Sequence, residues 1–166
     1  MKKIFFVFAF SFFTYSGFSQ NMNTEKMGQI FKSVSDSIQG GNGQWQFQIK
    51  KVVFMCVTDT KYNRMRIISP IAEAKQIDEK LKSAALIANF HSALDVKYAI
   101  ADDILWSVFI HPLKELSEAQ VKDAIKQVYS ANVTFGTTFS STDLVFPGNQ
   151  KKEEKKKEKK LLKKEF

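Results

Sequence analysis

The sequence predicts an α+β domain in which helices flank one antiparallel five-stranded sheet. Apolar residues recur at helical spacing in three segments, and five other segments alternate or are continuously apolar, as strands do. Most connections between the five strands are too short to hold a crossover helix, which favours antiparallel neighbours. The expected order along the chain is helix, three strands, helix, two strands, helix.

The first helix is expected to begin at Asn23 or Thr24, because either side chain can cap it. Its apolar residues share one face, and the glycines that follow at Gly40, Gly41 and Gly43 are expected to end it and to act as a linker. The apolar face is formed by Met27, Ile30, Phe31, Val34 and Ile38.

Three strands are expected after the glycines. Residues 45–49 alternate between apolar and polar side chains, which indicates a strand with one buried face. Residues 52–58 are apolar at nearly every position and predict a strand covered on both faces. Residues 64–71 form the third strand, in which Arg64 and Arg66 share one face.

The second half of the chain continues the pattern. Pro70 is expected to close the third strand, and a helix is expected from about residue 73 to residue 90. Strands over 96–100 and 104–110 follow, and Pro112 stops the second of them. The last helix begins at a capping box of Ser117 and Gln120, in which each side chain binds the other residue's backbone N–H.

Residues 1–19 are typical of a secretory signal peptide. Lysines near the N-terminus precede an apolar run over 4–13, which is about half the length that a helix needs to cross a bilayer. Gly17 and Ser19 predict cleavage before Gln20. We expect export to the periplasm or outside the cell, with no transmembrane span after cleavage. The alternative, a short buried helix, has no amphipathic face. The phenylalanine-rich run followed by a glutamine resembles exported proteins of the Bacteroidetes group.

The segment 151–166 holds nine lysines and four glutamates, a net charge of +5. Without this tail and without Lys2 and Lys3, the formal net charge of +8 falls to +1 for residues 20–150. The domain therefore lacks the basic surface of a nucleic-acid-binding protein, and no nucleic acid is expected as a partner. The tail is either a solvated segment or a weak contact for an anionic surface of the cell envelope.

Residues for catalysis or metal binding are sparse. The single cysteine, Cys56, lies in an apolar strand and cannot form an internal disulfide. His91 precedes Asp95 by four residues, which one helical turn would bring together. A small periplasmic hydrolase or ligand-binding protein that uses this pair is the alternative function. No metal-ligand spacing or phosphate-binding motif is present, so we expect no cofactor and no enzymatic activity.

The sequence instead favours a binding module. Residues 52–57 and 104–110 form strands that are apolar on both faces, and three helices can cover only one face of the sheet. The other face would then be covered by a second copy of the chain in a homodimer, by a bound polypeptide, or by the segment from Phe135 to Phe146.

Five side chains are candidates for binding a partner. Phe54, Trp106 and Phe109 are the aromatic anchors, with ordinary core packing as the alternative. Arg64 and Arg66 would bind a carboxylate or a phosphate, with a solvated sheet face as the alternative.

Two segments carry a resemblance to a known family. Residues 63–70 look like the strand that leads to the central helix of the YbjN-type family, and residues 89–95 look like the exit from that helix. With the element order, they resemble the class I type III secretion chaperone fold shared by that family, over roughly residues 22–131. The resemblance implies a domain over 20–150 that dimerises or binds extended polypeptide, without chemistry of its own. The export signal and the lysine-rich tail depart from the family pattern.

Overall fold

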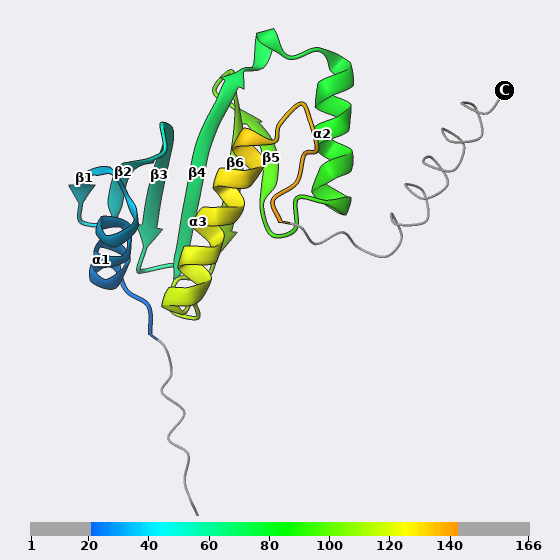
Figure 1. The fold of residues 1–166 in the computed structure, drawn as a ribbon. Coiled ribbons are helices and arrows are strands. Elements are labelled where there is room, and N and C mark those ends of the chain that lie inside the picture. The colour runs from blue at the N-terminus through cyan, green and yellow to red at the C-terminus, as the bar shows by residue number, and fades with distance from the viewer. Residues whose placement is uncertain (1–20, 143–166) are drawn as a thin grey trace, which may run out of the picture.

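The computed structural model describes residues 21–142. The predicted signal peptide and the lysine-rich tail therefore lie outside the described residues. Within the described range, one antiparallel sheet runs in the order β1-β2-β3-β4-β6-β5 and is accompanied by three α-helices (Figure 1). The elements are α1 (Thr24–Val34), β1 (Ser37–Gly41), β2 (Gln44–Ile49), β3 (Val52–Asp59), β4 (Arg64–Glu73), the 3₁₀ turn η1 (Ala74–Gln76), α2 (Glu79–His91), β5 (Lys97–Ala101), β6 (Ile104–His111) and α3 (Glu118–Val133).

The α+β class, the antiparallel pairing and the three helices are confirmed, but residues 21–142 form six strands instead of five. The additional strand is β1, in the segment that we expected to be a helix end and a linker. Helix α1 stops at Val34, so Ile38 lies in β1 opposite Phe47 of β2. Gly40 permits this hairpin: its φ is +97°, and a Cβ there would lie 2.4 Å from the carbonyl oxygen of Gln44.

Strand β4 is longer than predicted. It passes through Pro70 and continues to Glu73, with a register shift between Pro70 and Ala72 against β6. Because proline has no N–H to donate, the bulge next to it lets the strand resume pairing. Helix α2 consequently begins at Glu79, six residues later than expected, where the Asp78 carboxylate accepts a 2.7 Å hydrogen bond from the Leu81 N–H.

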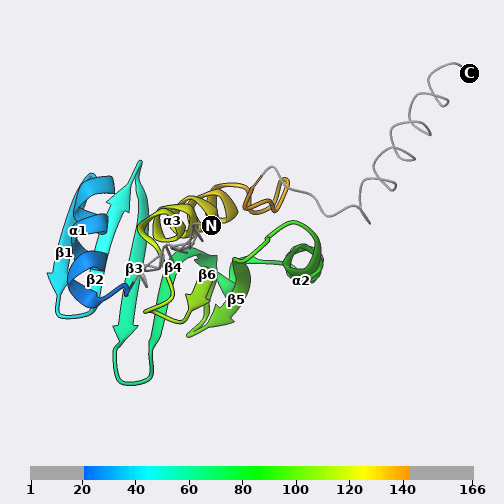
Figure 2. The ribbon, with the colours of Figure 1, turned by 90° about the horizontal axis from the view of Figure 1, so that it is seen from below.

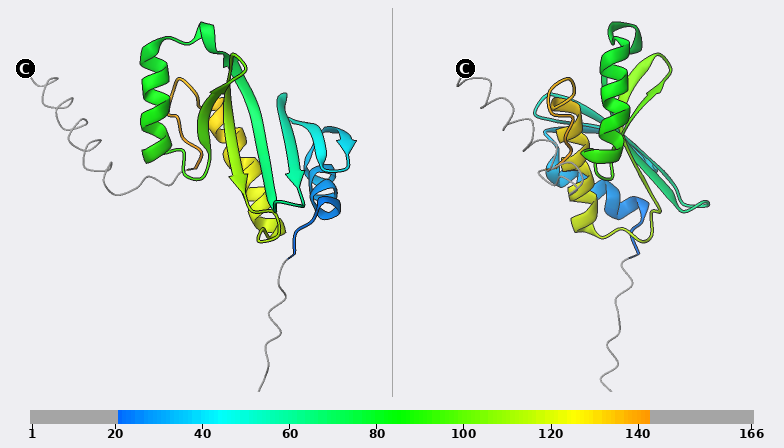
Figure 3. Two further views of the ribbon diagram at one scale, coloured as in Figure 1. Left: turned by 180° about the vertical axis from the view of Figure 1, so that it is seen from behind. Right: turned by 90° about the vertical axis from the view of Figure 1, so that its right-hand side faces the viewer.

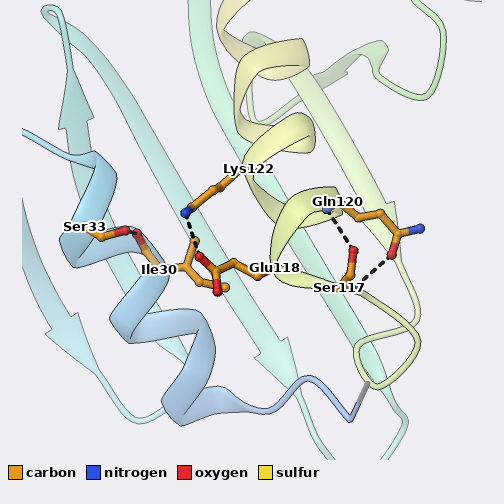
Figure 4. Close-up of polar contacts among 6 residues, drawn as sticks. All are labelled: Ile30, Ser33, Ser117, Glu118, Gln120 and Lys122. Carbon is orange, nitrogen blue, oxygen red and sulfur yellow. Dashed lines mark hydrogen bonds and ion pairs between the residues drawn. The ribbon is translucent and has the colours of Figure 1, made fainter. Parts of the chain in front are cut away.

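The capping box of α3 is confirmed (Figure 4). The Ser117 Oγ accepts a hydrogen bond from the Gln120 N–H at 3.1 Å, and the Gln120 Oε1 accepts one from the Ser117 N–H at 2.8 Å. One turn further on, Lys122 forms an ion pair with Glu118 at 2.6 Å. The start of α3 is therefore fixed by contacts within its first turn.

Helices α1 and α3 lie on the same face of the sheet, while α2 lies beyond the edge strand β5 (Figure 2). The core fills the space between the sheet and the two covering helices. Aromatic rings of α1 and of the strands meet there, with Phe47 stacked between Phe31 and Phe54 at centroid distances of 4.6 and 5.0 Å. The opposite face of the sheet carries no helix of the described chain (Figure 3).

Candidate protein-binding surfaces

The sheet face that the helices leave uncovered is largely apolar. Strand alternation sends the buried residues Cys56, Ile67 and Phe109 toward the helices and their neighbours to the opposite side. We call this opposite side the open face. Its central residues are Val53, Met55 and Val57 of β3, Arg64, Arg66, Ile68 and Pro70 of β4, and Trp106, Val108 and Ile110 of β6.

Two rows of cross-strand neighbours run across the open face. In one row, Arg66 lies between Val57 and Ile110, which are 47% and 56% exposed. In the other, Ile68 lies between Met55 and Val108, and all three are partly buried by their neighbours within the sheet. The three central strands therefore present to solvent an apolar surface that Arg66 interrupts.

Arg64 and Arg66 share one face of β4, as the alternation predicted, and both are exposed. The Arg64 guanidinium donates a 2.9 Å hydrogen bond to the carbonyl oxygen of Asn63. Within residues 21–142 neither Arg64 nor Arg66 forms an ion pair. Both cations are thus available for a carboxylate brought by a partner.

Of the three predicted aromatic anchors, only Trp106 lies on the open face. Its indole N–H donates a 3.0 Å hydrogen bond to the Ala101 carbonyl oxygen, which fixes the ring at the β5 side of the sheet. Phe54 is fully buried, and Phe109 is 6% exposed. Both point toward the helices, so these two rings belong to the core and not to the open face.

A second apolar surface lies on α2 and was not predicted from the sequence. Leu86, Ile87 and Phe90 are 68%, 59% and 80% exposed. The helix turns only Ala85 and Ala88 fully into the core. Apolar residues lie on two sides of this helix, one against the core and one exposed, and that pattern was readable in the sequence. We call Leu86, Ile87 and Phe90 the α2 ridge.

The structure does not form the predicted pair of His91 and Asp95. Helix α2 ends at His91, so the chain leaves the helical path before it reaches Asp95. The Asp95 carboxylate instead accepts a 3.1 Å hydrogen bond from the side chain of Gln127, and no hydrogen bond or ion pair among the described residues joins it to His91. The geometry that a hydrolase based on this pair requires is absent.

The segment after α3 does not cover the open face either. The rings of Phe135 and Phe139 lie 5.6 and 6.0 Å from the ring of Tyr98, on the side of the sheet that carries α3. Phe146 lies outside the described residues. The open face therefore remains uncovered by residues 21–142.

The remaining chemistry of the described residues is sparse. Cys56 is buried, and burial raises the pKa of its thiol above the ordinary value. In this part of the chain no three His, Cys, Asp or Glu residues are grouped to hold a metal ion. None of its helices is both long enough and apolar enough to span a membrane.

Comparison with known proteins identifies the fold. No protein-family model matches the chain, and no curated protein sequence matches it. A chain in the crystal structure of the Yersinia pestis type III secretion chaperone SycH, in complex with a stable fragment of YscM2, matches with a TM-score of 0.53 and 13% identity. The match covers 68% of this chain and 98% of that one. The fold is that of the secretion chaperones.

A second match is found in the HopA1–SchA chaperone–effector complex. It has a TM-score of 0.49 and 13% identity, over 66% of this chain and 95% of that one. The expected secretion-chaperone fold is therefore confirmed by the SycH comparison, whereas membership of the YbjN-type family stays a prediction.

Proposed function

We propose that this chain is a non-catalytic, chaperone-like protein-binding module of the cell envelope that takes up extended polypeptide on its open face. The observation that carries the proposal is the apolar surface across β3, β4 and β6, which no described residue covers. The comparison with SycH, seen in complex with a fragment of YscM2, supports a role in protein binding.

The chemistry of the open face defines the partner. Apolar side chains of an extended segment would pack over Met55, Ile68 and Val108, with Trp106 as the aromatic anchor at one side. Arg64 and Arg66 would bind carboxylates of the same segment. The preferred ligand is therefore a polypeptide in which apolar residues are followed by acidic ones.

Self-association is assigned to the α2 ridge. Leu86, Ile87 and Phe90 project from one helix that stands apart from the covering helices, so two copies can pair the same patch around a twofold axis. Such a homodimer would leave the open face of each copy free for polypeptide. The dimer and the bound polypeptide thus use different surfaces.

Peptide binding tests the open face. We would titrate the chain into fluorescently labelled, extended peptides with an apolar half and an acidic half, and follow anisotropy. Val57→Glu or Ile110→Glu should weaken binding by about tenfold or more, because each places a charge within the apolar surface. Gln29→Glu, on the exposed side of α1, is the matched control and should bind as the parent does. Equal affinity for parent and open-face variants would contradict the proposal.

Light scattering across a dilution series tests the dimer. The parent should be dimeric, and Leu86→Ser with Phe90→Ser should be monomeric while still binding peptide. If the α2 variant stays dimeric and Ile110→Glu dissociates, the open face is the self-association surface. A monomeric parent at every concentration would remove the homodimer from the proposal.

The cellular location rests on residues outside the described range. The signal-peptide pattern of residues 1–19 supports export, and the intact mass of the chain from the envelope fraction should correspond to a mature protein that begins at Gln20. A weak contact of the lysine-rich tail with the anionic envelope surface belongs to the same proposal. It predicts vesicle binding that falls steeply with added salt.

A further inference from the structure

A cleft of about 450 Å³ lies between the first half of α3, the end of β6 and the segment that leads into β5. Its apolar lining comes from Leu94, Phe109, Ile110 and Leu116. Two carboxylates, of Asp95 and Asp123, lie on its wall. The cleft is separate from the α2 ridge and meets the open face only at Ile110.

A buried glutamine brings the two carboxylates together. The Gln127 side chain is 1% exposed, and its Nε2 donates to an oxygen of Asp123 at 2.7 Å and to an oxygen of Asp95 at 3.1 Å. The Gln127 Oε1 accepts a 3.3 Å hydrogen bond from the Asp95 N–H. Both carboxylates thus accept from the same nitrogen atom, which holds them close together. The amide is neutral, so it does not neutralise either negative charge.

The basic groups beside the cleft are engaged with the backbone. The Lys97 ammonium donates to the carbonyl oxygen of Asn89 at 2.9 Å and to that of Leu94. The His111 Nδ1 lies 2.8 Å from the Pro112 carbonyl oxygen. Neither basic side chain forms an ion pair with a cleft carboxylate among the described residues. The cleft therefore combines apolar lining residues with two exposed carboxylates, which suits lysine side chains: the stem packs on the apolar residues and the ammonium meets the acids.

The described chain ends beside this cleft. Ser141 is buried, its hydroxyl donates to the Ala93 carbonyl oxygen at 2.7 Å, and its N–H donates to the Ser92 carbonyl oxygen at 3.2 Å. These contacts hold the exit of the chain next to Leu94 and Asp95. The ten residues from Ser141 to Lys151 span roughly 30 Å when extended, which is ample to bring the tail back to the cleft.

We propose that the lysine-rich tail, residues 151–166, docks in this cleft of its own chain. Its nine lysines and net charge of +5 complement Asp95 and Asp123. The short linker keeps the tail at an effective concentration in the millimolar range, so a weak contact is sufficient for occupancy. An anionic envelope surface would compete for the same lysines.

Paramagnetic relaxation tests the contact in the full mature chain. Glu158→Cys places a thiol in the tail, to which a nitroxide is attached. The native thiol of Cys56 stays unlabelled, because it is buried and unreactive. At low salt, the amide signals of Leu94, Leu116 and Gln120 should be broadened selectively, and about 0.5 M salt should restore them. Even broadening over the whole domain would overturn the proposal.

Two double variants identify the acids responsible. Asp95→Asn with Asp123→Asn should reduce the broadening severalfold. Asp102→Asn with Asp103→Asn removes the same charge from the exposed β5–β6 turn and should leave it unchanged. If both double variants reduced the broadening equally, the tail would be attracted only by the net charge of the domain, and the proposed site would be overturned. Broadening in a mixture of isotope-labelled chain and separate spin-labelled chain would show docking between copies, which also overturns the proposal.

Discussion

The hydroxyl of Tyr98 in the edge strand β5 donates a 2.8 Å hydrogen bond to the carbonyl oxygen of Ala131 in the last turns of α3. Tyr98 is 4% exposed and Ala131 is fully buried, so water cannot replace this donor. Tyr98→Phe should therefore lower the free energy of unfolding by about 1–2 kcal/mol, because it leaves a buried acceptor unpaired. Urea denaturation measures the loss. Tyr62→Phe, at a residue 67% exposed, is the control and should change stability by less than about 0.5 kcal/mol.

The same tyrosine makes stability depend on alkaline pH. Burial raises the pKa of Tyr98 from 10.0 to about 12 in the folded chain. Between these two values the unfolded chain has lost the phenolic proton while the folded chain still holds it, so the stabilisation is complete below pH 10 and is lost as the pH rises toward 12. The difference in unfolding free energy between the parent and Tyr98→Phe should shrink over this window. A difference that stays constant would contradict the raised pKa.

Two adjacent glycines provide a matched test of the β1–β2 hairpin. Gly40→Ala would force a Cβ to within 2.4 Å of the Gln44 carbonyl oxygen at a φ of +97°. The expected cost is more than about 1 kcal/mol. A Cβ at Gly41 would meet no heavy atom within 4 Å, so Gly41→Ala should be close to neutral. Chemical denaturation measures the stability of both variants. Equal destabilisation of the two would argue against the close approach at Gly40.

The capping box of α3 should contribute more to the free energy of unfolding than the ion pair beside it. Ser117→Ala removes the acceptor for the Gln120 N–H and is expected to cost about 1 kcal/mol, whereas Ser117→Asp should retain most of the stability. Lys122→Ala breaks the exposed pair with Glu118 and should cost only about 0.3–0.5 kcal/mol. Thermal denaturation of the three variants ranks these contacts. A larger loss for Lys122→Ala than for Ser117→Ala would reverse our assignment.

Much of the fold was predictable because most elements carry a clear hydrophobic period. The strand β1 was not, because its pairing with β2 depends on the tight approach at Gly40 and not on an apolar pattern of its own. The continuation of β4 past Pro70 also depends on a partner, since β6 supplies the pairing beyond the bulge. In both places a contact with another strand outweighed the local preference.

The candidate binding surfaces were predictable in part. The uncovered sheet face followed from the number of helices, and the arginines share one face of β4 as expected. The directions of Phe54 and Phe109 were not decided by sequence, because a strand that is apolar on both sides does not show which side meets the helices. The contact between Asp95 and Gln127 joins residues 32 positions apart, so no local spacing could reveal it.

The position of α2 beyond the edge of the sheet has a consequence for its dynamics (Figure 3). Only two alanines, Ala85 and Ala88, are fully buried beneath this helix, so little apolar surface is lost when it detaches. Its amide protons should exchange with deuterium through local opening, well ahead of those in the central strand β4. Helix α2 should therefore exchange early in the isolated chain, and it is also the segment in which the proposed homodimer should produce the largest protection.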